Sequence, residues 1–185
     1  MTDLLRTDRL VLRAFEPEDW RGLHALQSDP ETSRYLTFEP FTEQDSRDYI
    51  SRDVQARAEQ PLRGFEFAAT LAETGEFLGR CGLMIHDAEL GDASFWYVLD
   101  RRHRGRGLML EAARRLIDFA FADLGLRRLW ADVDPRNLAS AKLAERLGLR
   151  LEAHFLENVI IKGELCGTLI YAMLRREWKA GSLLP

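Results

Sequence analysis

Four arginines stand within residues 101–106, and two glycines, Gly105 and Gly107, are interleaved with the last of them. A segment with apolar residues at helical spacing begins directly afterwards, at Leu108. The first N–H groups of a helix have no partner inside it, and the helix dipole adds partial positive charge there. Glycines allow close approach of an anion and positive φ angles. This stretch therefore predicts an anion-binding loop at a helix start.

The glycine spacing disfavours the two common nucleotide loops. A dinucleotide fingerprint needs a third glycine at position 110, which is Leu110, and the Gly-Lys-Ser or Gly-Lys-Thr of a Walker loop does not follow. A solvated basic turn, or a patch that touches RNA phosphates, stays open as an alternative. The net charge of −4 argues against general nucleic-acid binding, so the basic loop is a local feature of an acidic protein.

The loop joins a predicted strand to a predicted helix. Residues 95–99 are aromatic and β-branched, which is typical of a buried strand, and residues 108–124 have the pattern of an amphipathic helix. A second strand follows at 128–133. Because strand, crossover helix and strand form a βαβ unit, the two strands are expected to be parallel neighbours. Binding sites gather at the carboxyl ends of such strands, where the loop lies.

The rest of the chain predicts mainly antiparallel strands and three more helices. The strands are expected at 9–13, 65–71, 77–85, 150–156 and 165–175, and the helices at 17–29, from Thr42 to about residue 60, and from Asn137 to Gly148. The fold class is therefore α+β, a mixed, mostly antiparallel sheet of about seven strands flanked by about four helices. One domain over residues 1–185 fits this length.

A second group of residues follows the strand at 128–133. Asn137 suits the N-cap of the next helix, and Ser140 at the third helical position can complete that cap. This capping role is the alternative to any part in chemistry.

Both groups resemble signatures of the GNAT superfamily of N-acetyltransferases. Arg102-x-x-Gly105-x-Gly107 resembles its acyl-CoA pyrophosphate loop, and Asn137-x-x-Ser140 with residues 145–149 resembles its second signature. Residues 7–13, 105–112 and 171–178 are similar to the ribosomal-protein N-terminal acetyltransferase branch. The chain departs from the pattern at Asp100-Arg101, where Asp-Pro is usual, and at Cys166-Gly167, where the last hairpin often carries an aspartate.

The resemblance implies a GNAT fold with a splayed parallel pair and direct acetyl transfer from acetyl-CoA, without a nucleophilic cysteine or a metal. A backbone N–H of Val98 or Leu99 would hold the acetyl oxygen, Asn137 the pantetheine arm, and Ser140 would assist the leaving sulfur. The residues expected to bind the cofactor are Val98, Leu99, Arg102, Arg104, Gly105, Arg106, Gly107, Leu108 and Asn137.

The general base is assigned by position to Glu157, which follows the sixth predicted strand, where the branch places a carboxylate that acts through water. Glu152 is the second carboxylate, and His86 and His154 are bases by chemistry alone. The plain alternative is a solvated strand-end charge for either glutamate and a turn or sheet-face residue for either histidine.

The acceptor implied by the branch is a primary amine, expected to be a peptide or protein N-terminus. An acidic region, Glu31, Glu39, Glu43, Asp45 and Asp48, would attract a cationic amine or a basic protein. A polyamine, an amino-sugar antibiotic, or a role as a non-catalytic acyl-CoA-binding regulator are the alternatives. The sequence leaves open a homodimer and the use of longer acyl-CoAs.

Apolar runs are too short to cross a bilayer, and the N-terminus lacks the apolar core of a signal peptide, so we expect a cytoplasmic protein with no membrane or nucleic-acid partner. Cys81 and Cys166 are expected to be buried free thiols.

Overall fold

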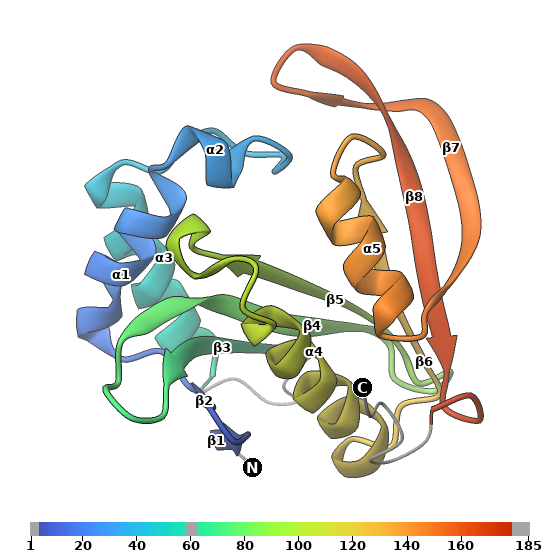
Figure 1. The fold of residues 1–185 in the computed structure, drawn as a ribbon, viewed down its shortest axis with the longest axis horizontal. Helices are drawn as coiled ribbons and strands as arrows, with labels where there is room; N and C mark the ends of the chain where they lie inside the picture. The colour runs from blue at the N-terminus through green and yellow to red at the C-terminus, as the bar shows by residue number, and fades with distance from the viewer. Residues whose placement is uncertain (1–3, 58–62, 179–185) are drawn as a thin grey trace.

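A computed structural model describes residues 4–57 and 63–178, which form one eight-stranded mixed sheet with helices on both faces (Figure 1). The strands are β1 Leu4–Arg6, β2 Leu10–Arg13, β3 Gly64–Leu71, β4 Phe77–Asp87, β5 Asp92–Leu99, β6 Arg128–Val133, β7 Arg150–Ile161 and β8 Glu164–Leu174. Their order is β1-β2-β3-β4-β5-β6-β8-β7, and among these described strands only β5 and β6 pair in parallel. The α+β prediction is confirmed, and β1 is the strand that the sequence analysis missed.

Within the described ranges, five α-helices flank the sheet: α1 Trp20–Gln27, α2 Pro30–Ser33, α3 Glu43–Ala56, α4 Leu108–Asp118 and α5 Leu138–Arg146. Phe67 faces the core formed with α4 and α5, whereas its neighbour Ala68 faces the core formed with α1 and α3. The addition to the four expected helices is the single turn α2, which Pro30 starts and Asp29 caps. None of the helices within the described residues is long and apolar enough to cross a membrane.

Both ends of α3 and the end of α4 test the helix boundaries that the sequence predicts. Thr42 and Asp45 form the expected capping box at the start of α3. The helix runs to Ala56, and the predicted extension to about residue 60 falls on residues 58–62, outside the described part of the chain. At the end of α4 the chain widens into a π-helical turn over Phe119–Asp123, which places Phe119 and Phe121 in the core.

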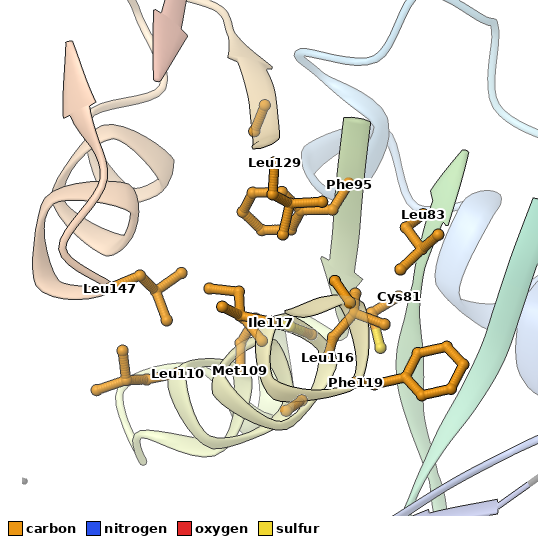
Figure 2. Close-up of a cluster of buried hydrophobic side chains, with 14 of the residues drawn as sticks. Cys81, Leu83, Phe95, Met109, Leu110, Leu116, Ile117, Phe119, Leu129 and Leu147 are labelled. Atoms are coloured by element: carbon orange, nitrogen blue, oxygen red, sulfur yellow. The ribbon is translucent and has the colours of Figure 1, made fainter. Parts of the chain in front are cut away.

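The apolar face of α4 fixes this helix on the sheet. Figure 2 shows Met109, Leu110, Leu116 and Ile117 of α4 among side chains from β4, β5 and β6 and Leu147, which directly follows α5. Each fully buried aliphatic side chain of this kind contributes roughly 1.5–3 kcal/mol. The position of the α4 N-terminus is therefore set by the core, not by the loop that precedes it.

The parallel pair β5 and β6 is short, because the strands pair only from Asp92↔Arg128 to Ser94↔Trp130. Beyond Ser94, β5 stays paired with β4 up to Leu99, while β6 stays paired with β8. The carboxyl halves of β5 and β6 therefore diverge, as the splayed-pair prediction requires.

Candidate functional site

The loop between β5 and α4 has the backbone conformation that its glycines predict. Gly105 and Gly107 both lie in the left-handed region, with φ angles of 77° and 75°. A Cβ on Gly105 would meet nothing within 4 Å, and one on Gly107 would meet only Arg9 Nη2 at 3.6 Å. The first N–H groups of a helix have no partner inside it. Among the described residues no side chain caps α4, so these groups stay available to a ligand. The loop thus offers backbone donors and open space to an anion.

The arginines of the loop differ in how far their charges are compensated. Arg102 binds the buried carboxylate of Asp100 through Nε and Nη2, at 3.0 and 2.7 Å to Oδ2, and these bonds lower the pKa of Asp100. Arg104 donates at 3.4 Å to Leu99 O and to Thr32 Oγ1. The exposed Arg106 has no ion pair within residues 4–57 and 63–178. Arg104 and Arg106 therefore keep charge available for a ligand.

The diverging carboxyl halves of β5 and β6 leave a gap between the two strands. The pairing of β5 with β4 shows that Leu99, and not Val98, can donate a hydrogen bond toward this gap. Asp100 N–H donates to Leu78 O of β4 at 2.9 Å, and the Val98 carbonyl lies against Gly79 of the same strand. Because successive residues of an antiparallel ladder face opposite sides, Val98 and Asp100 face β4 and Leu99 faces away from it. The N–H group of Leu99 is therefore directed toward the edge of β5 that is no longer paired with β6.

Across this gap, α5 is capped as its sequence predicts. Asn137 Oδ1 accepts the Ser140 N–H at 3.2 Å, and Gly148 after the helix has a φ of 85°. The cap uses the Ser140 backbone, and among the described residues the Ser140 hydroxyl has no hydrogen-bond partner. Tyr97 of β5 donates to Ser140 O at 3.3 Å, and burial raises the pKa of Tyr97 to about 12. Ser140 thus lies beside the splayed end of β5.

Both parallel strands end in the same aspartate turn, a feature that the sequence analysis missed. After β6, Asp134 accepts the Arg136 N–H at 2.8 Å and the guanidinium at 2.7 Å, as Asp100 does with Arg102 after β5. Burial opposes ionisation of Asp134, but the bonds from Arg136 outweigh it and its pKa is lowered. The Asp-x-Arg spacing at both strand ends was the available signal.

Glu157 lies in a bulge of β7, where the register to β8 shifts between Phe155 and Val159. Its φ of 50° is unusual for a residue other than glycine, and its side chain is exposed. Opposite the bulge, a Cβ on Gly167 would lie 3.5 Å from Pro135, which precedes α5. The bulge is therefore at the same end of the sheet as the start of α5.

Two of the other base candidates, Glu152 and His86, have structural partners. Glu152 is bound by Arg128 at 2.6 Å and by Arg150 at 2.5 Å, and these bonds lower its pKa. His86 is 2.8 Å from Ser94 Oγ and stacks on Trp130, near the amino end of β5. His154 is an exposed residue of β7. Glu152, within β7, is held by two ion pairs and is not a solvated strand end, and His86 lies in β4 and not in the turn expected from residue 86 onward. Glu157 therefore stays the candidate.

Both cysteines are buried and free, as predicted, and burial raises the pKa of Cys81 to about 12. Within the described residues no cluster of histidine, cysteine and carboxylate side chains is suited to a metal ion.

Three segments far apart in the sequence meet at α2, which the sequence analysis did not predict. Lys162 in the β7–β8 turn donates to Ser33 O at 2.7 Å, and Arg104 of the glycine loop reaches Thr32. The Arg136 guanidinium lies 5.9 Å from the ring centroid of Tyr35, just after α2. The segment around α2 therefore bridges both sides of the splayed strands (Figure 1).

Comparison with known proteins assigns most of the chain to one domain family. The family model described as "Acetyltransferase (GNAT) domain" matches residues 9–150. The chain is 36% identical over 177 residues to "Uncharacterized N-acetyltransferase p20" of Bacillus licheniformis, covering 95% of this chain and 98% of the relative. It is 27% identical to "Putative ribosomal N-acetyltransferase YdaF" of Bacillus subtilis, covering 93% of this chain and 94% of the relative.

Solved structures give the same fold. A GNAT-family acetyltransferase from Bacillus anthracis superposes with a TM-score of 0.83 at 24% identity, covering 94% of this chain and 99% of that one. A spermidine N-acetyltransferase from Vibrio cholerae, solved with CoA and spermine, superposes with a TM-score of 0.81 at 22% identity, covering 92% and 98%.

Proposed function

Because this chain belongs to the GNAT superfamily of N-acetyltransferases, which use acetyl-CoA, we propose that the CoA pyrophosphate binds the Gly105–Leu108 loop and that acetyl passes directly to a primary amine. The observation that carries this proposal is the uncapped start of α4, where two left-handed glycines leave backbone donors open beside a splayed strand pair. Among the described residues, Arg104 and Arg106 add uncompensated positive charge to the same loop, and Arg102 lies beside them with its charge compensated by Asp100.

The transfer forms one bond and breaks another. The amine nitrogen attacks the acetyl carbon, the C–S bond breaks, the amine loses a proton and the thiolate gains one. The Leu99 N–H, directed into the gap, is suited to hold the acetyl oxygen, a role normally worth about 2.7–4 kcal/mol per donor. The unpartnered hydroxyl of Ser140 is suited to donate toward the sulfur. Asn137 would hold the pantetheine arm from the same helix start.

We assign the base role to Glu157, acting through water on the acceptor amine. Its exposed carboxylate has no ion pair within the described residues, unlike that of Glu152, and its bulge lies at the α5 end of the sheet. Two guanidinium groups keep the carboxylate of Glu152 ionised, which leaves Glu157 as the candidate carboxylate without an arginine partner among the described residues.

The acceptor we propose is the N-terminus of a peptide or protein. The relative named as a ribosomal N-acetyltransferase supports this choice, as does the exposed acidic surface of Glu31, Glu39, Glu43, Asp45 and Asp48 around α2 and α3. Glu43 is paired with Arg47, whereas Glu31 and Glu39 have no ion pair within the described residues. This surface would attract a cationic acceptor.

We further infer that a homodimer would form along β7, the last strand of the sheet order. Five large apolar side chains are exposed on β7 and β8: Leu151, Phe155, Leu156, Ile160 and Leu165. A second copy would remove these side chains, and the free backbone groups of the edge strand, from water.

A CoA-release assay across N-terminal peptides, polyamines and amino-sugars tests the proposed acceptor. We expect the highest kcat/KM on a peptide with a free α-amine, and loss of that activity when the α-amine is blocked. A clear preference for spermidine or an amino-sugar over every peptide would contradict the peptide acceptor and leave the acetyl-CoA chemistry standing. Binding of acetyl-CoA without turnover on any amine would instead indicate a regulator.

A further inference from the structure

The turn between β1 and β2 reaches across to the first turn of α4. Thr7 Oγ1 donates to Glu111 Oε1 at 2.5 Å, and the Arg9 N–H donates to the same oxygen at 2.9 Å. The Arg9 guanidinium binds Glu111 Oε2 through Nε at 2.7 Å and Nη2 at 2.6 Å. Its remaining nitrogen, Nη1, donates to the carbonyl oxygen of Arg106 at 3.0 Å. One side chain therefore binds both the glycine loop and the helix that follows it.

The bond to the Arg106 carbonyl fixes one peptide unit of the loop. In a trans peptide the carbonyl oxygen and the next N–H group point in opposite directions. Because Arg9 holds the carbonyl of Arg106, the N–H of Gly107 is directed away from Arg9. This orientation leaves the Gly107 N–H available to the anion that we assign to the loop.

The bonds to Glu111 remove a conflict of charge. Glu111 lies in the first turn of α4, where the proposed pyrophosphate would also lie. Burial disfavours its ionised form, but the bonds from Thr7 and Arg9 outweigh this effect and its pKa is lowered, so the carboxylate stays charged. Without a guanidinium partner, that charge would repel a phosphate at close range.

We propose that Arg9 is a positioning residue of the acyl-CoA site. It orients the Arg106–Gly107 peptide unit and compensates the charge of Glu111, and so prepares the loop for a pyrophosphate. This inference rests on the proposed location of acetyl-CoA on the loop. Thr7 supports it by holding the other Glu111 oxygen.

The test compares Arg9→Gln with Arg13→Gln. Arg13 lies at the end of β2, the strand that follows Arg9, and makes a matched two-bond ion pair with Asp19, at 2.6 and 2.8 Å, away from the loop. Calorimetric titration with CoA should show affinity reduced about tenfold or more in Arg9→Gln, the size expected when a charge-assisted contact is lost. Arg13→Gln should lower the Tm and leave the CoA Kd within about twofold.

A second substrate distinguishes an effect on the pyrophosphate loop from a general loss of active-site structure. S-acetylpantetheine lacks the pyrophosphate, so its KM and kcat should be nearly unchanged in Arg9→Gln. Should Arg9→Gln fold poorly, Arg9→Lys, which keeps the charge but not the fork, serves instead and should weaken CoA binding by a smaller factor.

Glu111→Gln identifies the route by which Arg9 acts. If Arg9 works by compensating Glu111, the Arg9→Gln effect on CoA affinity shrinks in the Glu111→Gln background. An undiminished effect there would overturn the compensation of Glu111 and assign the effect to the bond between Arg9 and the Arg106 carbonyl. Unchanged CoA affinity in folded Arg9→Gln would overturn the positioning role. A separate variant tests whether CoA binds at the loop at all. If Gly105→Ala binds CoA normally, the proposed location of the pyrophosphate is wrong.

Discussion

At the residue scale, Ser140 shows how capping and chemistry can be separated. The cap bond joins Asn137 Oδ1 to the Ser140 N–H and leaves the hydroxyl free. We expect Ser140→Ala to keep the Tm and to lower kcat more than it raises the KM for acetyl-CoA. Asn137→Ala should cost about 0.5–2 kcal/mol of stability through loss of the cap. Steady-state kinetics and thermal melts distinguish the catalytic role from the capping role. Wild-type turnover in Ser140→Ala would show that Ser140 contributes only its backbone N–H to the cap.

The two carboxylates of β7 give a second comparison between residues. Glu157→Gln should remove the part of the pH–rate profile in which activity rises with pH, because the amide cannot accept a proton. Glu152→Gln on the same strand should leave that profile unchanged. Its effect should be on stability, because the lowered pKa of Glu152 contributes stability above the unfolded pKa that is lost as the pH falls. An unaltered profile in Glu157→Gln would transfer the base role to another group.

At the element scale, the two ends of α4 provide a matched pair of glycines. Gly105 before the helix and Gly125 after it have φ angles of 77° and 69°, and a Cβ on either would meet nothing within 4 Å. Alanine at either position should therefore cost a similar amount of stability, about 1–2 kcal/mol for the left-handed conformation.

Only Gly105→Ala should also weaken CoA binding, because its methyl group occupies space that we assign to the pyrophosphate. Titration of both variants with CoA, alongside their melting curves, tests this expectation. Equal CoA affinities in the two folded variants would place the pyrophosphate elsewhere.

At the scale of the whole molecule, charge is distributed unevenly. The chain carries 26 basic and 30 acidic residues, yet the glycine loop is basic and the surface around α2 and α3 is acidic. Two substrates of opposite charge would each meet a surface of the favourable sign. In the acceptor assay, the KM of a lysine-containing peptide should therefore rise with ionic strength more steeply than that of a neutral peptide.

Much of the fold is readable from local patterns. The switch from alternating to helical periodicity locates β3, β4, β5 and α4, and the capping residues Thr42 and Asn137 locate two helix starts. The strand–helix–strand order alone predicts the parallel pair. Short elements cannot be predicted from such patterns. Strand β1 has three residues with only Leu5 buried, too few to form a pattern, and α2 is a single turn.

The sequence by itself determined the glycine loop, its arginines, the cap at Asn137 and the superfamily resemblance, because each of these depends on residues close together in the chain. Tertiary structure decided which backbone N–H faces the gap, since only the β4–β5 register separates Leu99 from Val98. It also decided that Arg9 meets Glu111, 102 residues away, and that Lys162 meets Ser33, 129 residues away. Such contacts follow from how the sheet and its helices pack, and residue spacing along the chain does not encode them.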